Sequence, residues 1–229
     1  MKCDPVETLV AAVEALGFDR VGTSTEGRSI RGRRFGEAGP ALLVFGGIHG
    51  DEPASVEALI ELAARVADVR PPALPLWLIP AVNPDGVARG QKNSARDVDL
   101  NRNFPARSFT PAHAPGYFPG PAALSEPEAR AIADLIDREP IAAVVAVHAP
   151  FACVNYDGPA EAWAAAVSAA CGWPARGDIG YPTPGSLGSW LGIDRGLPVL
   201  TLELPPGPLS RFRGPAAAAL DESIRAAPL

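Results

Sequence analysis

Cysteine and histidine are both scarce in this chain. Its 229 residues include three cysteines and three histidines. The cysteines, Cys3, Cys153 and Cys171, are odd in number and show neither a C-x-x-C pair nor regular spacing. Such usage indicates reduced, mostly buried thiols and excludes a disulfide framework or a thiolate zinc site.

Long apolar runs and clusters of basic residues are also missing. No stretch reaches the ~18 apolar residues typical of a membrane-spanning helix, and Asp4, Glu7 and Glu14 interrupt the apolar residues of the first turns, unlike a secretory signal. The formal charge is −6, with no basic stripe that would neutralise a phosphate backbone. We therefore expect a cytoplasmic protein that binds neither membrane nor nucleic acid. The oligomeric state stays open.

The overall composition is that of a folded globular domain of ordinary size. Hydrophobic residues make up 47% and charged residues 20%, and the 26 prolines and 23 glycines are scattered between apolar runs as loop punctuation. We expect one domain over residues 1–229. Its predicted fold class is α/β, with a mixed, mainly parallel twisted sheet and helices on both faces.

Local patterns predict the elements of that fold. Apolar residues recur at helical spacing or in short β-rich runs, with polar or glycine-rich turns between them. The predicted elements are a helix over 6–16, an edge hairpin over 18–35 with its arginines toward solvent, a strand over 41–45, a helix from 53, a strand over 75–82, a turn over 83–86, a polar loop over 87–105, a helix starting at the capping box 125–128, a strand over 141–147, a helix over 161–171, a loop over 181–196, a strand over 198–204 and a helix over 215–227.

Three predicted strands end on side chains that can bind a metal or move a proton. His49 and Glu52 follow the strand over 41–45, His148 ends the strand over 141–147, and Glu203 lies near the end of the last strand. Because parallel strands place their carboxyl ends along one edge, these side chains can meet. Two histidines and one carboxylate are a typical ligand set for a catalytic zinc with an open position. His49 and Glu52 taken alone could also lie in a solvated turn.

Two further groups extend this site. Glu203 at the end of an apolar strand is the natural general base, because desolvation raises a carboxyl pKa; a structural ion pair with an arginine is the alternative. Arg102 beside Asn101 can bind a substrate carboxylate through parallel donors, or else serve as a helix cap or surface residue. His113, in a Pro-rich loop without a carboxylate at ligand spacing, is expected to face solvent.

Taken together, these motifs resemble the zinc carboxypeptidase family. The resemblance is carried by His49-x-x-Glu52, the stretch Asp99 to Phe104, His148 after a strand, and Glu203 in Thr-Leu-Glu-Leu. It covers most of the chain. Within the family the residues around 47–52, 125–128, 148–153 and 180–186 resemble most closely the bacterial murein tripeptide amidases, which cut the bond between γ-D-glutamate and meso-diaminopimelate during cell-wall recycling.

The resemblance implies a role for each matching residue. His49, Glu52 and His148 would hold one zinc ion per chain, and Asp99 would orient His49. Asn101 and Arg102 would bind the free carboxylate of a small peptide substrate. Tyr181 would close over the substrate.

Two positions depart from the related amidases. Lys92 stands where they place an arginine that polarises the scissile carbonyl, and Arg89 or Arg96 could take over that role. Ala149 follows the third ligand where they carry an acid, a change that bears on specificity.

The expected reaction is zinc-assisted amide hydrolysis with Glu203 and Lys92 as catalytic residues. One alternative is an N-acyl amino acid deacylase similar to aspartoacylases and succinylglutamate desuccinylases, which share the HxxE and Asn-Arg signatures; the loop over 181–190 favours the peptidase. Another is a catalytically silent, carboxylate-binding zinc protein. The presence of Glu203 speaks against it, because such a protein needs the ligands but not the base.

Overall fold

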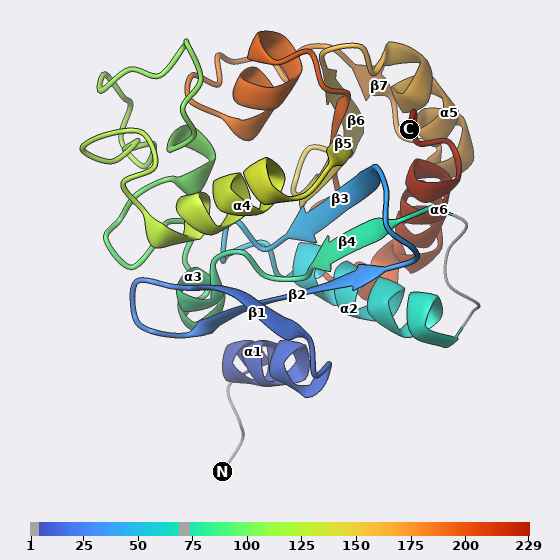
Figure 1. Ribbon diagram of the computed structural model, residues 1–229, viewed down its shortest axis with the longest axis horizontal. Helices are drawn as coiled ribbons and strands as arrows, with labels where there is room; N and C mark the ends of the chain where they lie inside the picture. Colours follow the sequence, from blue (N-terminus) through green and yellow to red (C-terminus); the bar gives the residue numbers. More distant parts are fainter. Residues whose placement is uncertain (1–4, 69–73) are drawn as a thin grey trace.

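The computed structural model describes residues 5–68 and 74–229, and within these ranges the strands form one eight-stranded sheet (Figure 1). Its strand order is β1-β2-β4-β3-β5-β8-β6-β7. The strands are β1 (Asp19–Thr23), β2 (Ser29–Phe35), β3 (Ala41–Gly46), β4 (Leu76–Ile79), β5 (Ile141–His148), β6 (Cys153–Asp157), β7 (Ala175–Arg176) and β8 (Val199–Glu203). Four central strands, β4, β3, β5 and β8, run parallel, and β1–β2 and β2–β4 are antiparallel pairs. β6 runs antiparallel to β8 and parallel to β7.

Helices cover both faces of the sheet, as the α/β prediction requires. The α-helices are α1 (Pro5–Ala15), α2 (Pro53–Asp68), α3 (Pro84–Arg89), α4 (Pro127–Arg138), α5 (Glu161–Cys171) and α6 (Arg213–Arg225). Short 3₁₀ turns occur at Leu100–Arg102 and Leu209–Arg211, and a π-helical segment at Gly188–Asp194. None of the described helices combines the length and apolar character needed to cross a membrane.

Alternate residues of the central strands point to opposite faces and build two separate cores. Leu42 and Val44 of β3 pack with α2, α5 and α6, whereas Leu43 and Phe45 pack with α4 and the π-helical segment (Figure 1). Every residue of β3 is buried. A strand enclosed on both faces reads as a continuous apolar run, which is why the sequence predicted it.

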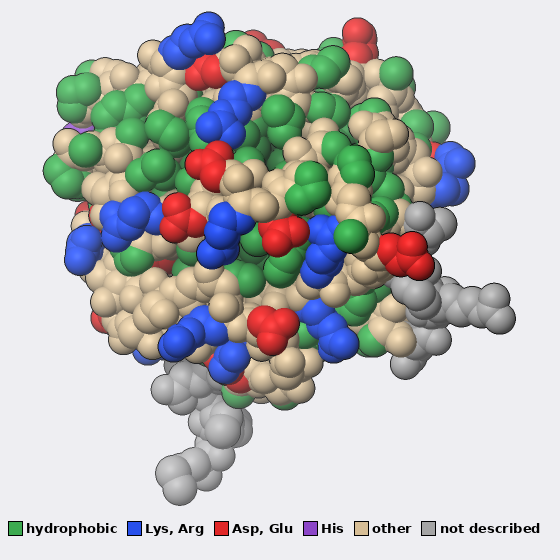
Figure 2. Space-filling view, viewed as in Figure 1, with side chains coloured by type: hydrophobic (Ala, Val, Ile, Leu, Met, Phe, Trp, Pro, Cys, Tyr) green, Lys and Arg blue, Asp and Glu red, His purple; other side chains and the backbone are tan. Residues whose placement is uncertain are grey.

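The hairpin prediction is confirmed at the sheet edge, but most of its arginines do not simply face solvent. Arg28 pairs with Asp85 and Glu26, Arg31 with Glu14, and Arg34 with Glu139. These pairs connect the edge to α1, α3 and the end of α4. Figure 2 shows the resulting surface on one face, where basic and acidic side chains are interspersed.

Three local predictions need correction. The residues 83–86 are not an isolated turn: Asn83 accepts a hydrogen bond from the backbone N–H of Gly86 and thereby caps α3. The predicted capping box at 125–128 is absent, because α4 begins after Glu126, whose side chain makes no capping bond and instead accepts from Ser94 and Ser125. The predicted loop over 181–196 contains the π-helical segment.

The sequence also left β6 and β7 unpredicted. The β6 segment, Cys-Val-Asn-Tyr-Asp, buries Val154 in the core while Asn155 and Asp157 face a cavity, so it lacks an apolar run. Cys153 and Cys171 are buried free thiols, as expected. Cys3 lies outside the described residues.

Candidate metal centre and active-site cavity

The carboxyl ends of β3, β5 and β8 lie side by side and bring the predicted residues together. His148 and Glu203 are directly paired across β5 and β8, and β3 lies on the other side of β5. His49 follows β3 in a turn that requires close backbone approach, because a Cβ atom at Gly50 would overlap the backbone of Gly86. This contact fixes the turn against α3.

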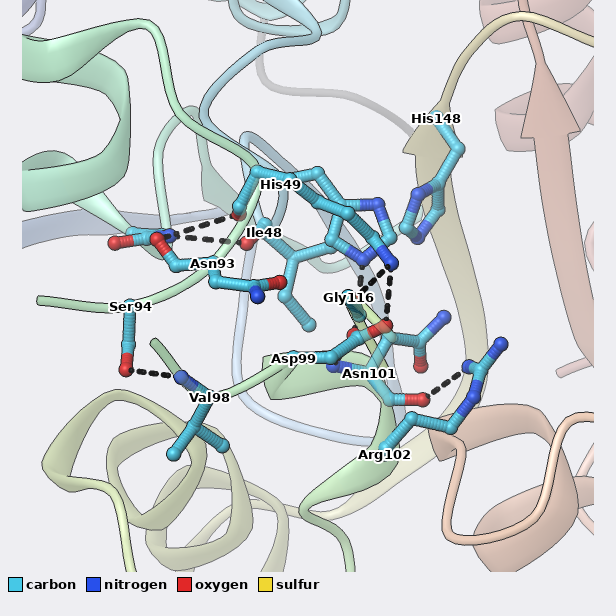
Figure 3. A network of polar contacts seen from close by, with 12 residues as sticks. Ile48, His49, Asn93, Ser94, Val98, Asp99, Asn101, Arg102, Gly116 and His148 are labelled. Carbon is cyan, nitrogen blue, oxygen red and sulfur yellow. Dashed lines mark hydrogen bonds and ion pairs between the residues drawn. The ribbon is translucent and has the colours of Figure 1, made fainter. Parts of the chain in front are cut away.

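His49, Glu52 and His148 form a compact group at this edge. The Glu52 carboxylate lies 2.8 Å from Nδ1 of His49 through one oxygen and 3.1 Å from Nδ1 of His148 through the other. Their potential ligand atoms all lie within 4.8 Å of one another, and the two imidazole centroids are 4.9 Å apart. Figure 3 shows the two imidazoles close together, His49 from the turn after β3 and His148 from the end of β5, with their planes inclined at 65°.

The donor set of this group fits a zinc ion. Oε2 of Glu52 is buried, and although Nδ1 of His148 lies 3.1 Å away, no described group is placed to donate a hydrogen bond to it. A buried carboxylate oxygen without a donor is costly unless a cation satisfies it. Two imidazoles and one carboxylate leave the fourth zinc position open, as in catalytic sites.

Electrostatic interactions within this group lower the pKa of Glu52 and raise the pKa of His49. Burial by itself would raise the pKa of Glu52, but the neighbouring His148 and His49 hold it at about 2. Burial would lower the pKa of His49, yet hydrogen bonds to Asp99 and Glu52 raise it to about 9. Glu52 is therefore a carboxylate at neutral pH, as a metal ligand must be, and a metal binding here displaces a proton from His49.

Asp99 contacts the ring nitrogen of His49 that does not face Glu52. Its Oδ1 lies 3.1 Å from Nε2 of His49 and also accepts the backbone N–H of Asn101 at 3.0 Å (Figure 3). The side chain is fully buried. Burial would raise its pKa, but the hydrogen bond to His49 and the charges of His49, Arg102 and Lys92 hold it below the ordinary value. An ionised Asp99 fixes the orientation of the His49 ring.

Glu203 lies beside the group without belonging to it. The residue is 5% exposed, and its carboxylate accepts a hydrogen bond from the backbone N–H of Phe151 at 3.5 Å. Burial and the negative charge of Glu52 raise its pKa, against the opposing effect of His148. No arginine of the described ranges pairs with Glu203, so the alternative of a structural ion pair is wrong. A buried carboxylate with a raised pKa suits proton transfer.

Asn101 and Arg102 stand on the 3₁₀ turn after Asp99 and line the same cavity. Arg102 is 6% exposed, and its Nη1 donates to the backbone carbonyl of Asn101 at 2.6 Å. No described carboxylate forms an ion pair with Arg102. The surface alternative for Arg102 is therefore wrong, and its guanidinium can accept an anion from the cavity.

The three candidates for a carbonyl-polarising cation lie in different surroundings. Only Lys92 lines the cavity; Arg89 pairs with Glu26, and Arg96 lies 3.9 Å from Glu126. The Lys92 ammonium is 2.7 Å from Asp99 and donates to the Gly116 carbonyl at 3.1 Å. It also lies 3.7 Å from the centroid of the Tyr117 ring, a cation–π contact.

Aromatic side chains surround the mouth of the cavity. The Tyr181 ring lies 6.3 Å from Tyr117 and 6.1 Å from Phe151, with Phe151 46% exposed. Burial raises the pKa of Tyr181, so its hydroxyl stays protonated at neutral pH. The sequence pointed to Tyr181 but missed Tyr117, because nothing in the Pro-rich loop marks it. His113 is exposed in that loop, as predicted.

The cavity has a volume of about 620 Å³ and extends well beyond the metal group. Its far end is lined by Asn155, Asp157 and Thr201, none of which the sequence identified. Ala149, at the departure from the related amidases, lines it as well. A cavity of this size accommodates a small peptide but not a folded protein.

Comparison with known proteins agrees with this geometry. Residues 14–161 match the family described as zinc carboxypeptidase. Murein peptide amidase A of Escherichia coli (strain K12) is 35% identical over 182 residues, which are 72% of this chain and 71% of that protein. Murein peptide amidase A of Vibrio campbellii is 34% identical over 177 residues, 72% of this chain and 69% of that one.

Solved structures share the fold. The murein-tripeptide amidase MpaA from Escherichia coli O157 superposes with a TM-score of 0.74 at 29% identity, covering 90% of this chain and 89% of that one. Thrombin-activatable fibrinolysis inhibitor superposes at 0.77 with 17% identity, covering 97% and 76%, which shows the fold alone.

Proposed function

The chain belongs to the zinc carboxypeptidase family, and from this we propose that it hydrolyses an amide bond next to a free carboxylate, the γ-D-glutamyl–meso-diaminopimelate bond of murein peptides. One observation carries the proposal. A zinc-type ligand group, a buried carboxylate with a raised pKa and an arginine without a carboxylate partner line a single cavity. Amide hydrolysis at a chain end needs all three.

Each residue takes one task in this reaction. Bound by His49, Glu52 and His148, Zn²⁺ supplies Lewis-acid activation of water and of the scissile carbonyl. Glu203 takes the proton of the attacking water and gives it to the departing amine. Its raised pKa makes the carboxylate a stronger base, so that it can hold the proton between the two transfers.

Substrate positioning falls to the other side of the cavity. Arg102 and the side-chain amide of Asn101 bind the free carboxylate next to the scissile bond. Of Lys92, Arg89 and Arg96, Lys92 is the one that lines the cavity, so we assign it to the scissile carbonyl, and to bind there it has to leave Asp99. Tyr181 closes over the bound peptide, with its hydroxyl as a hydrogen-bond donor.

The biological setting is part of the same proposal. Murein peptides released from the wall and taken up by the cell are small enough for the cavity, which supports a role in peptidoglycan recycling in the cytoplasm. The buried free thiols of Cys153 and Cys171 suit a reducing compartment.

The test compares substrate classes on zinc-loaded protein. A γ-D-glutamyl-meso-diaminopimelate peptide, an N-acyl aspartate and an N-acyl glutamate are incubated separately, and products are identified by mass spectrometry. We expect cleavage of the murein peptide alone. Preferred cleavage of the N-acyl amino acids would instead assign the deacylase activity. Zinc-loaded protein that cleaves none of them would point to the silent carboxylate-binding protein.

A further inference from the structure

Tyr117 contacts both cations that the proposed hydrolysis assigns to the substrate, although that hydrolysis gives it no task. The Lys92 ammonium lies 3.7 Å from the centroid of the Tyr117 ring, and the guanidinium carbon of Arg102 lies 5.4 Å from the same centroid. Tyr117 is 37% exposed and lines the cavity together with both cations. A ring face attracts a cation that lies within ~6 Å of its centroid. The ring therefore interacts with two positive charges of the active site.

Backbone carbonyls anchor the loop that carries this ring. The carbonyl of Phe118 accepts a hydrogen bond from the backbone N–H of Asp99 at 2.8 Å. The carbonyl of Pro119 accepts one from the side-chain amide of Asn103 at 2.7 Å. Neither bond involves the side chain of Tyr117. Replacing that side chain should therefore leave the loop in place, so the ring can be tested by substitution.

Two contacts of the Lys92 ammonium come from this loop. The ammonium is 2.7 Å from the Asp99 carboxylate, donates to the Gly116 carbonyl at 3.1 Å and lies over the Tyr117 ring. To reach the scissile carbonyl, Lys92 has to leave Asp99. A hydrogen bond weakens steeply with its angle, whereas a ring face attracts a cation over several ångströms. The contact with Tyr117 can therefore persist while the ammonium moves.

Lys92 needs such support more than an arginine would. A guanidinium is planar and presents its donors in a rigid fork, whereas a lysine carries a point charge on a flexible four-carbon stem. Fixing that stem costs side-chain entropy before the charge can act at one point. A ring against the ammonium restricts it to the cavity surface and so offsets part of this cost.

We propose that Tyr117 is a positioning residue that acts through Lys92, keeping the ammonium at the cavity surface while it moves from Asp99 to the scissile carbonyl. The inference rests on the proposed function, because it assumes that Lys92 acts on that carbonyl. The hydroxyl of Tyr117 is not needed, since the cation interacts with the face of the ring. Tyr117→Phe should therefore keep the effect, and Tyr117→Leu should lose it.

A double-mutant cycle on zinc-loaded protein tests whether the ring acts through Lys92. With a γ-D-glutamyl-meso-diaminopimelate peptide, Tyr117→Leu should lower kcat roughly 3- to 30-fold, with KM changed less than about twofold because carboxylate binding is retained. Tyr117→Phe should restore kcat to within about twofold of the native value. In Lys92→Met protein, which lacks the charge, Tyr117→Leu should cause no further loss. An equal loss in both backgrounds would overturn the inference.

The matched control lies in the same loop. His113 is exposed, and its ring centroid lies 5.1 Å from that of Phe118. His113→Leu thus removes an aromatic ring from the loop without touching Lys92, and it should keep native kcat and KM. A loss in His113→Leu as large as that in Tyr117→Leu would show that the loop, and not the Tyr117 ring, supports activity, and would overturn the inference.

An NMR measurement separates this inference from the proposed function, because it needs no turnover. Lys2 and Lys92 are the only lysines of the chain, so ¹³C-lysine labelling gives few signals, and Lys92→Met identifies those of Lys92. The ring current of Tyr117 should shift the Lys92 methylene protons next to the ammonium upfield. Tyr117→Phe should keep this shift, and Tyr117→Leu should abolish it.

The two failures then give different results. A shifted Lys92 signal in protein that cleaves no peptide would reject the proposed hydrolysis while supporting the contact between ring and ammonium. An unshifted signal in protein that does cleave the peptide would overturn the inference about Tyr117 alone.

Discussion

The two ends of the cavity are built on opposite principles. At the metal end the polar side chains bind one another: Glu52 contacts both histidines, and Asp99 contacts His49 and Lys92. At the far end Asp157 has no partner within the described residues and is framed by glycines. The first end is organised before a substrate arrives, which favours catalysis. The second holds polar groups that take no part in the proposed hydrolysis. Changes at the metal end should therefore lower activity more than changes at the far end.

The largest effect should follow loss of the base at the metal end. Glu203→Gln should lower kcat by ~10²- to 10⁴-fold, the usual contribution of general acid–base catalysis. The amide keeps the shape of the side chain, so zinc content measured by atomic absorption should be unchanged. Asp221→Asn, at an exposed ion pair with Arg65, is a control that should retain full turnover. Equal turnover of Glu203→Gln and native protein would remove Glu203 from the mechanism.

Arg102→Ala should come next and should affect mainly substrate binding. Without the guanidinium, the substrate carboxylate would be buried without a partner. The resulting decrease in kcat/KM should correspond to roughly 2 to 5 kcal/mol of lost transition-state stabilisation. A substrate amidated at that carboxylate should bind poorly to the native protein and lose little more in the variant. Arg96→Ala, whose side chain is mostly exposed outside the cavity, is the control. An equal loss on both substrates would contradict the proposed pairing.

Asp99→Asn should produce a smaller effect, confined to the metal. Loss of the charge behind His49 should weaken zinc affinity about 10- to 100-fold, as is usual for residues that orient a metal-binding histidine. Competition with a chelator measures this affinity directly. Asp97→Asn in the same loop, where the side chain accepts a hydrogen bond from Asn93, should leave it unchanged. Unaltered affinity in Asp99→Asn would show that His49 is held by packing alone.

The smallest predicted effect is a displaced pH dependence. Glu203 must be ionised to accept a proton, and its pKa is raised by burial and by Glu52. Activity should therefore be lost, as the pH falls, at a higher pH than the ordinary glutamate pKa of ~4.3 would give. A pH profile of kcat/KM measures this acid limb. A limb at the ordinary value would show that Glu203 is better solvated than its burial implies.

The metal end was largely predictable from the sequence, whereas the far end was not. Short apolar runs in the sequence show where the central strands lie and where they end, and those ends carry His49, Glu52, His148 and Glu203. Parallel packing then brings the ends together. Asp157 is the last residue of a five-residue strand that alternates between core and cavity, so the strand lacks the continuous apolar run that marked the central strands. The capping box over 125–128 was also predicted wrongly because of a contact that is distant in the sequence. Glu126 accepts a hydrogen bond from Ser94.

The sequence by itself determined the α/β class, the order of the central elements and the chemical identity of the metal group, because each depends on local periodicity and on which side chains end a strand. Only the tertiary structure decided that Lys92 bonds to Asp99, that Tyr117 and Tyr181 share the cavity mouth, and that Asp157 lies across from Val199 among glycines. These contacts join residues far apart in the chain, and their distances are set by strand register and close packing, which no local pattern encodes.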